Sequence, residues 1–103
     1  TFITHRYGEA VEITPIWIAK NLPEINYDLV FAGRYNGNMQ TKAEICVSRD
    51  LCRMIEDCGE NALECAESGI STVLFNKPWN EGRFEHTNIK RVFLWEEVLR
   101  ALE

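Results

Sequence analysis

The 103-residue sequence has no apolar run that approaches the roughly 20 residues needed for a membrane-spanning helix. It also lacks the pattern of a basic segment followed by an apolar one that is typical of a secretion signal. Cations are few: 11 lysine and arginine residues stand against 16 aspartate and glutamate residues, a net charge of −5. Because a sequence-independent grip on nucleic acid needs clustered cations, we expect no nucleic-acid polymer and no membrane among the partners. We expect an intracellular, cytoplasmic protein.

Two common ligand-binding signatures are missing as well. The sequence has no Cys-x-x-Cys pair, and no Gly-x-Gly-x-x-Gly follows a strand, so a zinc site and a Rossmann-type cofactor site are both poorly supported. His5 and His86 lie far from the cysteine cluster in sequence, and neither has a recognisable nucleophile beside it. We expect reduced, mostly buried thiols. The cysteines are Cys46, Cys52, Cys58 and Cys65.

The composition is that of an ordinary globular protein, with 46% hydrophobic and 26% charged residues and no internal repeat. The length fits one domain over residues 1–103. Apolar runs predict strands at 2–4, 29–32, 52–55, 72–75 and 92–94. Cap residues and periodicity predict helices at 14–22, from 41 onward, through 62–66 with a stop at Gly69, and at 95–102. This alternation predicts an α/β fold with a mostly parallel sheet.

Polar residues follow several of these predicted strands. Thr4, the loop at 33–38, the Glu56-Asp57 pair and the loop at 76–80 each come directly after an apolar run. In parallel sheets ligands gather at the carboxyl ends of the strands. We therefore place the candidate site at that edge.

Four features of the sequence each allow a structural and a functional interpretation. Glu56-Asp57 is either an exposed acidic turn or a cation site, because adjacent carboxylates repel unless a cation lies beside them. Lys42, in the first turn of its helix, is either a solvated lysine or a phosphate ligand beside free amides. Thr4 either simply ends a strand or offers its hydroxyl to an anion. Trp79 is either a packed loop residue or an aromatic platform near the ligand.

Three segments, taken in their order along the chain, resemble motifs of haloacid dehalogenase-like (HAD) phosphohydrolases, in particular those of the 5′-nucleotidase-like branch. Residues 2–6 (FITHR) resemble the second motif, an apolar strand that ends in threonine or serine. Lys42 matches the third-motif lysine at a helix start. Residues 54–62 (MIEDCGENA) resemble the fourth motif, an acidic pair followed by Asn or Asp four residues after the second acid. Residues 69–80 look like the strand and loop that come next, so the resemblance covers nearly the whole chain.

The resemblance implies a partial Rossmann-like, HAD-type sheet and a phosphate site. Thr4 and Lys42 would hold the transferring phosphoryl group as the catalytic residues of this chain, and His5 would join them in binding phosphate. This division suits the chemistry, since a lysine ammonium neutralises charge that develops on a phosphoryl group.

The resemblance also implies a Mg²⁺ site at Glu56 and Asp57. Asp57 would be the direct or water-mediated ligand, with Glu56 and Asn61 in supporting positions. A hard divalent cation prefers such carboxylate oxygens. Cys58 would lie beside the metal, so its thiol is expected to be less inert than the other three.

One departure from the family pattern is decisive. The first HAD motif is an Asp-x-Asp sequence at the end of the central strand, whose first aspartate is the nucleophile and whose second is the general acid. The only aspartates here are Asp28, Asp50 and Asp57, so no Asp-x-Asp occurs. In the family's sheet the missing strand lies between the strand ending at Thr4 and the strand ending at Glu56. Since unpaired buried backbone groups cost about 1–3 kcal/mol each, we expect the chain not to fold as an ordinary independent monomer of that family.

Two functions follow from this departure. The first is the phosphate- and Mg²⁺-binding half of a HAD-like phosphatase that acts on a nucleotide or other small phosphomonoester and receives its Asp-x-Asp strand from another polypeptide. The second is a noncatalytic, HAD-derived assembly module that associates by strand exchange, for example with a second copy of itself.

Overall fold

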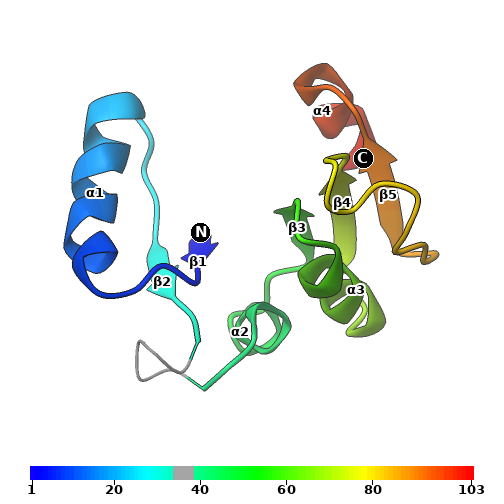
Figure 1. Ribbon diagram of the computed structural model, residues 1–103, viewed down its shortest axis with the longest axis horizontal. Coiled ribbons are helices and arrows are strands. Elements are labelled where there is room, and N and C mark those ends of the chain that lie inside the picture. The colour runs from blue at the N-terminus through cyan, green and yellow to red at the C-terminus, as the bar shows by residue number, and fades with distance from the viewer. Residues whose placement is uncertain (34–38) are drawn as a thin grey trace. The chain divides into compact units, whose positions relative to one another are not determined.

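The structure is a computed structural model that describes residues 1–33 and 39–103 (Figure 1). The chain forms two compact units, Thr1–Thr41 and Lys42–Glu103, which are described separately here. Apart from Gly33, the loop predicted at 33–38 lies outside the described residues. None of the described helices has both the length and the apolar character that a bilayer span requires.

The first unit is a strand–helix–strand motif. β1 (Phe2–Thr4) and β2 (Leu29–Phe31) pair in parallel, with Thr4 opposite Phe31, and α1 (Glu9–Asn21) connects them. An edge-to-face contact between the rings of Phe2 and Tyr27, with centroids 5.4 Å apart, supports the beginning of the pair. Both strands match the sequence prediction to within one residue.

The helix α1 begins at Glu9, earlier than the predicted start at Thr14. Thr14 does not cap a helix end: it is buried, and its hydroxyl donates to the Ala10 carbonyl one turn back. Pro15 is accepted inside the helix, where it removes one backbone donor. The signal for the true start was the pair Glu9 and Glu12 in the first turn, where the helix dipole favours negative charge.

The second unit is a three-stranded parallel sheet flanked by helices. The strands β3 (Arg53–Glu56), β4 (Ser71–Phe75) and β5 (Ile89–Val92) pair in that order, with β4 in the centre. The helices are α2 (Lys42–Ser48), α3 (Gly59–Glu67) and a closing segment, a 3₁₀ turn η2 (Trp95–Glu97) followed by α4 (Val98–Ala101). The α/β class with parallel pairing, predicted from the alternation of elements, is therefore confirmed.

Side chains from β4 are buried on both faces of this sheet. Val73 packs with Val92 and Val98 in a cluster that also contains Phe75, so this face is covered by α4. Thr72 and Leu74 point to the opposite face because side chains alternate along a strand, and both are almost completely buried. The helix α3 packs against β3 and β4, and α2 packs against α3. The unit therefore has helices on both faces of its sheet.

The closing segment differs from the prediction in its boundaries. β5 begins at Ile89, although the apolar run suggested a strand at 92–94. Lys90 and Arg91 interrupt the apolar pattern because β5 has only one strand partner among the described residues, and charged side chains are typical of such edge strands. The predicted helix at 95–102 divides into η2 and α4.

Candidate functional site

The acidic pair lies where β3 ends and α3 begins. Glu56 is the last residue of β3, Asp57 and Cys58 form the turn, and Gly59 opens α3. The neighbouring strand β4 is parallel and pairs Leu74 with Glu56, so the loop that follows β4 reaches the same edge of the sheet. The prediction that polar groups collect at this carboxyl edge therefore holds for the second unit.

Lys42 and Glu56 form a nearly buried ion pair. The Lys42 Nζ lies 2.9 Å from Glu56 Oε2, and the two side chains are 14% and 6% exposed. The other carboxylate oxygen, Oε1, accepts from the backbone N–H groups of Asp57 and Cys58 at 3.0 and 3.2 Å. One carboxylate thus joins the first turn of α2 to the turn after β3.

The protonation of Glu56 follows from these partners. Burial by itself would raise the pKa of Glu56, but the hydrogen bond and charge of Lys42, together with the two backbone donors, outweigh it. The pKa therefore lies below its ordinary value, and Glu56 is ionised at neutral pH. Because both of its oxygens already have partners in the chain, Glu56 serves here to hold Lys42 and the turn. That it also binds a cation stays a prediction.

Asp57 is held through its backbone, while its side chain is exposed. The Asp57 carbonyl accepts from Trp79 Nε1 at 2.9 Å and from Asn80 Nδ2 at 2.7 Å. Both lone pairs of that oxygen are thus used, so a cation would have to meet Asp57 at its carboxylate. Within the described residues that carboxylate has no hydrogen-bond or ion-pair partner, which leaves its oxygens open to a ligand.

Trp79 and Asn80 come from the loop after β4. Trp79 is more than half exposed and donates its indole N–H to the turn, so it acts as a tether and not only as a packed loop residue. Asn80 and Arg91 were missed by the sequence reasoning. One sequence signal could have pointed to Asn80. The loop follows a buried strand that is parallel to β3, and such a loop ends at the same sheet edge as the acidic turn.

The remaining predicted site residues fall in different places. Asn61, in the first part of α3, is half-buried, and no partner for its side-chain amide occurs among the residues described. Thr4 and His5 belong to the first unit, where the Thr4 hydroxyl accepts from the Arg6 N–H at 3.2 Å and the His5 side chain is exposed. The structure therefore brings together Lys42, Glu56 and Asp57.

The surroundings of Cys58 keep its thiol protonated. Burial raises the pKa of its thiol; the Asn61 N–H opposes this, but the Glu60 and Glu56 carboxylates add to the rise. The thiol donates to Glu60 Oε2 at 3.4 Å. Cys58 is therefore a protonated, weakly nucleophilic thiol.

A cavity of about 260 Å³ opens beside the acidic turn. It is lined by Ile55, Glu56, Asp57, Phe75, Lys77 and Trp95. The rings of Phe75 and Trp95 are 5.0 Å apart, and Lys77 Nζ lies 5.2 Å from the Phe75 ring centre. The cavity thus combines carboxylate, ammonium and aromatic surfaces at the carboxyl edge of the sheet.

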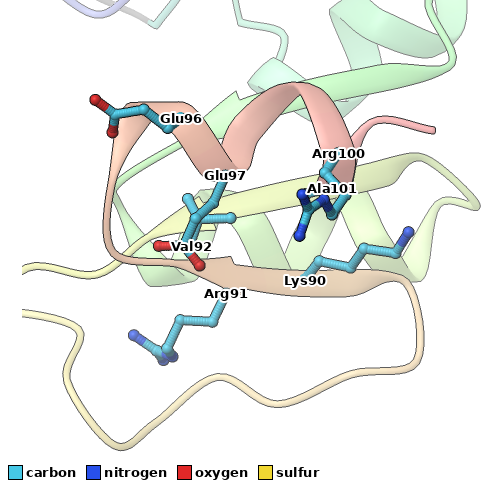
Figure 2. A pocket seen from close by; sticks show the side chains of 7 residues that line it. All are labelled: Lys90, Arg91, Val92, Glu96, Glu97, Arg100 and Ala101. Atoms are coloured by element: carbon cyan, nitrogen blue, oxygen red, sulfur yellow. The ribbon is translucent and has the colours of Figure 1, made fainter.

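A larger cavity, of about 520 Å³, lies between β5 and α4 (Figure 2). Its rim has charged residues of both signs, namely Lys90, Glu96, Glu97 and Arg100. The Glu97 carboxylate already has hydrogen-bond partners within the chain, because its Oε1 accepts from the N–H groups of Phe93 and Leu94. We place the candidate site at the smaller cavity because only that one contains the acidic turn.

The residues suit a Mg²⁺ ion only in part. Mg²⁺ usually binds one or two carboxylates and keeps several waters. Asp57 offers one open carboxylate, and the Asn61 amide follows it by one helical turn. Among the described residues no group of three or more histidine, cysteine, aspartate or glutamate side chains is arranged to hold a metal. If a Mg²⁺ ion bound at Asp57, waters or a substrate phosphate would have to supply most of its other ligands.

Comparison of the chain with protein-family models, with curated proteins and with solved structures gave no match.

Proposed function

We propose that this chain is the phosphate- and Mg²⁺-binding half of a HAD-like phosphohydrolase of the nucleotidase-like kind, with a small phosphomonoester as substrate. The observation that carries the proposal is the Lys42–Glu56 ion pair beside the open carboxylate of Asp57 at the end of β3. The aspartate nucleophile comes from an Asp-x-Asp segment outside these 103 residues.

In this proposal Lys42 neutralises the phosphoryl group. An ammonium has three donors, and Glu56 takes one of them, which leaves two for phosphate oxygens. Glu56 keeps the ammonium at a fixed position instead of letting the long side chain sample solvent. That Thr4 and His5 also bind phosphate stays a prediction from the sequence.

Asp57 carries the Mg²⁺, and Asn61 supports it. When bound, the ion would shield the charges of the phosphoryl oxygens and of the incoming carboxylate. Because Asp57 is fixed through its backbone, its carboxylate can meet the ion without reordering the turn.

The free edge of β3 supports the expectation of a further strand. The Ser71 N–H donates to the Cys52 carbonyl, and alternate residues of a parallel strand turn their backbone groups to the same side. The backbone groups of Arg53 and Ile55 therefore face away from β4, and no other described strand pairs with β3. Ile55 is also 42% exposed. A strand added here would end beside Asp57 if it ran parallel to β3.

The proposal is tested by mixing the full chain with a segment that contains an apolar strand ending in Asp-x-Asp and assaying hydrolysis of p-nitrophenyl phosphate. We expect Mg²⁺-dependent turnover that needs both polypeptides. Asp57→Asn and Lys42→Met should each reduce it by about 100-fold or more, as expected for loss of a charge at the reacting group. Lys90→Met, which removes an exposed ammonium from the rim of the other cavity, is the matched control. Undiminished turnover in the Asp57 and Lys42 variants would refute the assignment.

The open edge of β3 also favours a second function, a noncatalytic module that assembles by strand exchange. The two functions differ in what associates with the chain. A stable homodimer without Mg²⁺ affinity, measured by light scattering and calorimetry, would favour assembly. A complex with a second polypeptide that carries Asp-x-Asp would favour the divided enzyme.

A further inference from the structure

The loop after β4 and the turn after β3 meet at a single backbone atom. The Asp57 carbonyl oxygen accepts from two consecutive residues of that loop, Trp79 and Asn80, at 2.9 and 2.7 Å. On the other side of the same turn, the N–H groups of Asp57 and Cys58 both donate to Glu56. The Asp57 residue is thus gripped from its N–H and from its carbonyl, while its carboxylate is left open.

Of the two loop residues that donate to Asp57, Asn80 is the buried one. It has no exposed surface, and its side chain makes hydrogen bonds at both ends. Its Nδ2 donates to the carbonyls of Asp57 and Phe75, and its Oδ1 accepts from the Lys77 N–H at 3.1 Å and from Arg91 at 2.7 Å. These bonds use the two donors and the two acceptor sites of the amide, so its orientation is fixed.

Arg91 fixes Asn80 in place through hydrogen bonds to its side chain and to its backbone. Its guanidinium donates to the side-chain oxygens of Asn76 and Asn80 and to the backbone carbonyls of Asn80 and Arg83. Figure 2 shows Arg91 projecting from β5 away from α4, while Val92 projects toward it. The guanidinium thereby links the edge strand to the loop, and through Asn80 to the acidic turn.

From these contacts we infer that Asn80 is a positioning residue for Asp57, and that Arg91 acts through it. The inference rests on the proposed function, in which Asp57 meets Mg²⁺. Asn80 occupies the Asp57 carbonyl, so only the carboxylate is presented to the ion, and it holds the turn so that this carboxylate stays beside the Lys42–Glu56 pair. Partners that orient a metal ligand in this way commonly change metal affinity by 10–100-fold when they are replaced.

The test compares two asparagine-to-aspartate changes in the same loop. Asn80→Asp replaces the donor to Asp57 with an oxygen while keeping an acceptor for Arg91. Asn76→Asp also places a carboxylate against Arg91, but Asn76 makes no hydrogen bond to the acidic turn, so it is the matched control. Trp79→Phe removes only the second donor to Asp57 from an exposed position, and it keeps the test valid if Asn80→Asp does not fold.

The first measurement is amide hydrogen exchange in the metal-free full chain. In Asn80→Asp we expect the N–H groups of Asp57 and Cys58 to exchange roughly tenfold faster than in wild type, since the hydrogen bond from Asn80 to the Asp57 carbonyl is lost. Trp79→Phe should show a smaller rise, and Asn76→Asp none. The Val73 N–H, in the central strand, should be unchanged. A general loss of stability would instead accelerate Val73 as well, and that result would overturn a positioning role.

The second measurement is Mg²⁺ affinity by calorimetry, made with the Asp-x-Asp segment present. Asn80→Asp should weaken binding by about 10–100-fold and Asn76→Asp should leave it unchanged. Failure of the proposed function and failure of the positioning role would give different results. If exchange responds as expected but wild type binds no Mg²⁺, the proposed function is wrong while Asn80 still holds the turn. If the Asp57 and Cys58 amides do not respond, the positioning role is wrong whatever the ion does.

Discussion

Glu56 has three partners within the chain, and its ionisation is therefore linked to stability. Its pKa in the folded chain lies below the unfolded value of about 4.3, because Lys42 and two N–H groups favour the charged form more than burial disfavours it. A depressed pKa means that the stabilisation is fully present above the unfolded pKa. It is lost as the pH falls from there through the folded pKa.

Glu56→Gln should therefore destabilise the chain most at neutral pH. The variant leaves the Lys42 ammonium without its counter-charge, and we expect a loss of about 3 kcal/mol at pH 7. The difference from wild type should shrink as the pH falls below about 4.3. Urea unfolding at several pH values measures this, with the exposed Glu64→Gln as a control expected to lie within about 0.5 kcal/mol of wild type. A difference that stays constant with pH would contradict the account.

The four thiols should differ widely in reactivity. Burial, with Cys46 and Glu56 nearby, raises the pKa of Cys65 to about 12, and burial also raises the pKa of Cys46. Cys52 is exposed, whereas Cys58 is half-buried and has a raised pKa. Since the thiolate is the reactive form, Cys52 should react first with an aromatic disulfide reagent at neutral pH, and Cys46 and Cys65 only after unfolding.

Mass spectrometry after brief labelling measures that order. Cys52→Ser should remove the most rapidly labelled thiol, and with it the fast phase of the labelling reaction. Faster labelling of Cys58 than of Cys52 would show that the turn is more open than the structure has it.

At the scale of single residues, the sequence singled out the charged members of the candidate site but not the residues that hold them in place. Lys42, Glu56 and Asp57 were found because charges at a helix start and at a strand end are locally unusual. Asn80 and Arg91 carry no such local signal: an asparagine in a loop and an arginine in an edge strand are ordinary. Their role arises from contacts between segments more than ten residues apart, which only the folded chain reveals.

At the scale of the elements, the start of α3 packs closely against the loop after β4. A Cβ added to Gly59 would lie 2.1 Å from Cδ2 of the Phe84 ring, closer than atoms can approach. Phe84 itself has a φ of 66°, a left-handed conformation that is unusual for a bulky residue. The loop after β4 thus closes over the first residue of α3, next to Asp57.

Gly59→Ala should therefore destabilise the chain by about 1–3 kcal/mol through overpacking. The cause is checked by a double-mutant cycle with Phe84→Ala, read by thermal or urea unfolding. Removing the ring leaves space for the methyl group, so the Gly59→Ala penalty should become much smaller in that background. Equal penalties in both backgrounds would show that Phe84 is not what excludes a side chain.

The strands were easier to predict than the helix boundaries. Apolar runs bounded by polar residues located β1 to β4 to within a residue or two. The start of α1 was misplaced because Thr14-Pro15 has the form of a helix start, although Thr14 can also bind back within a helix. β5 was misplaced because Lys90 and Arg91 hide a strand that has only one partner among the described strands.

At the scale of the whole molecule, the proposed function depends on the edge of β3 that no other described strand pairs with. The backbone groups of Arg53 and Ile55 point to that edge, and the acidic turn follows directly. The outer edge of β5 is better protected against the addition of a strand. The Ile89 N–H donates to the His86 carbonyl, and the Phe93 N–H donates to Glu97. A strand that joins this sheet should therefore add at β3.

Hydrogen exchange at the Ile55 backbone amide tests this claim most directly. In the chain alone, this N–H should exchange quickly. With Mg²⁺ and an apolar strand segment ending in Asp-x-Asp, supplied at about 100 times its Kd, exchange should slow by about 100-fold. If the segment supports phosphatase turnover while the Ile55 amide stays unprotected, the strand does not join β3 and the proposed half-site is wrong.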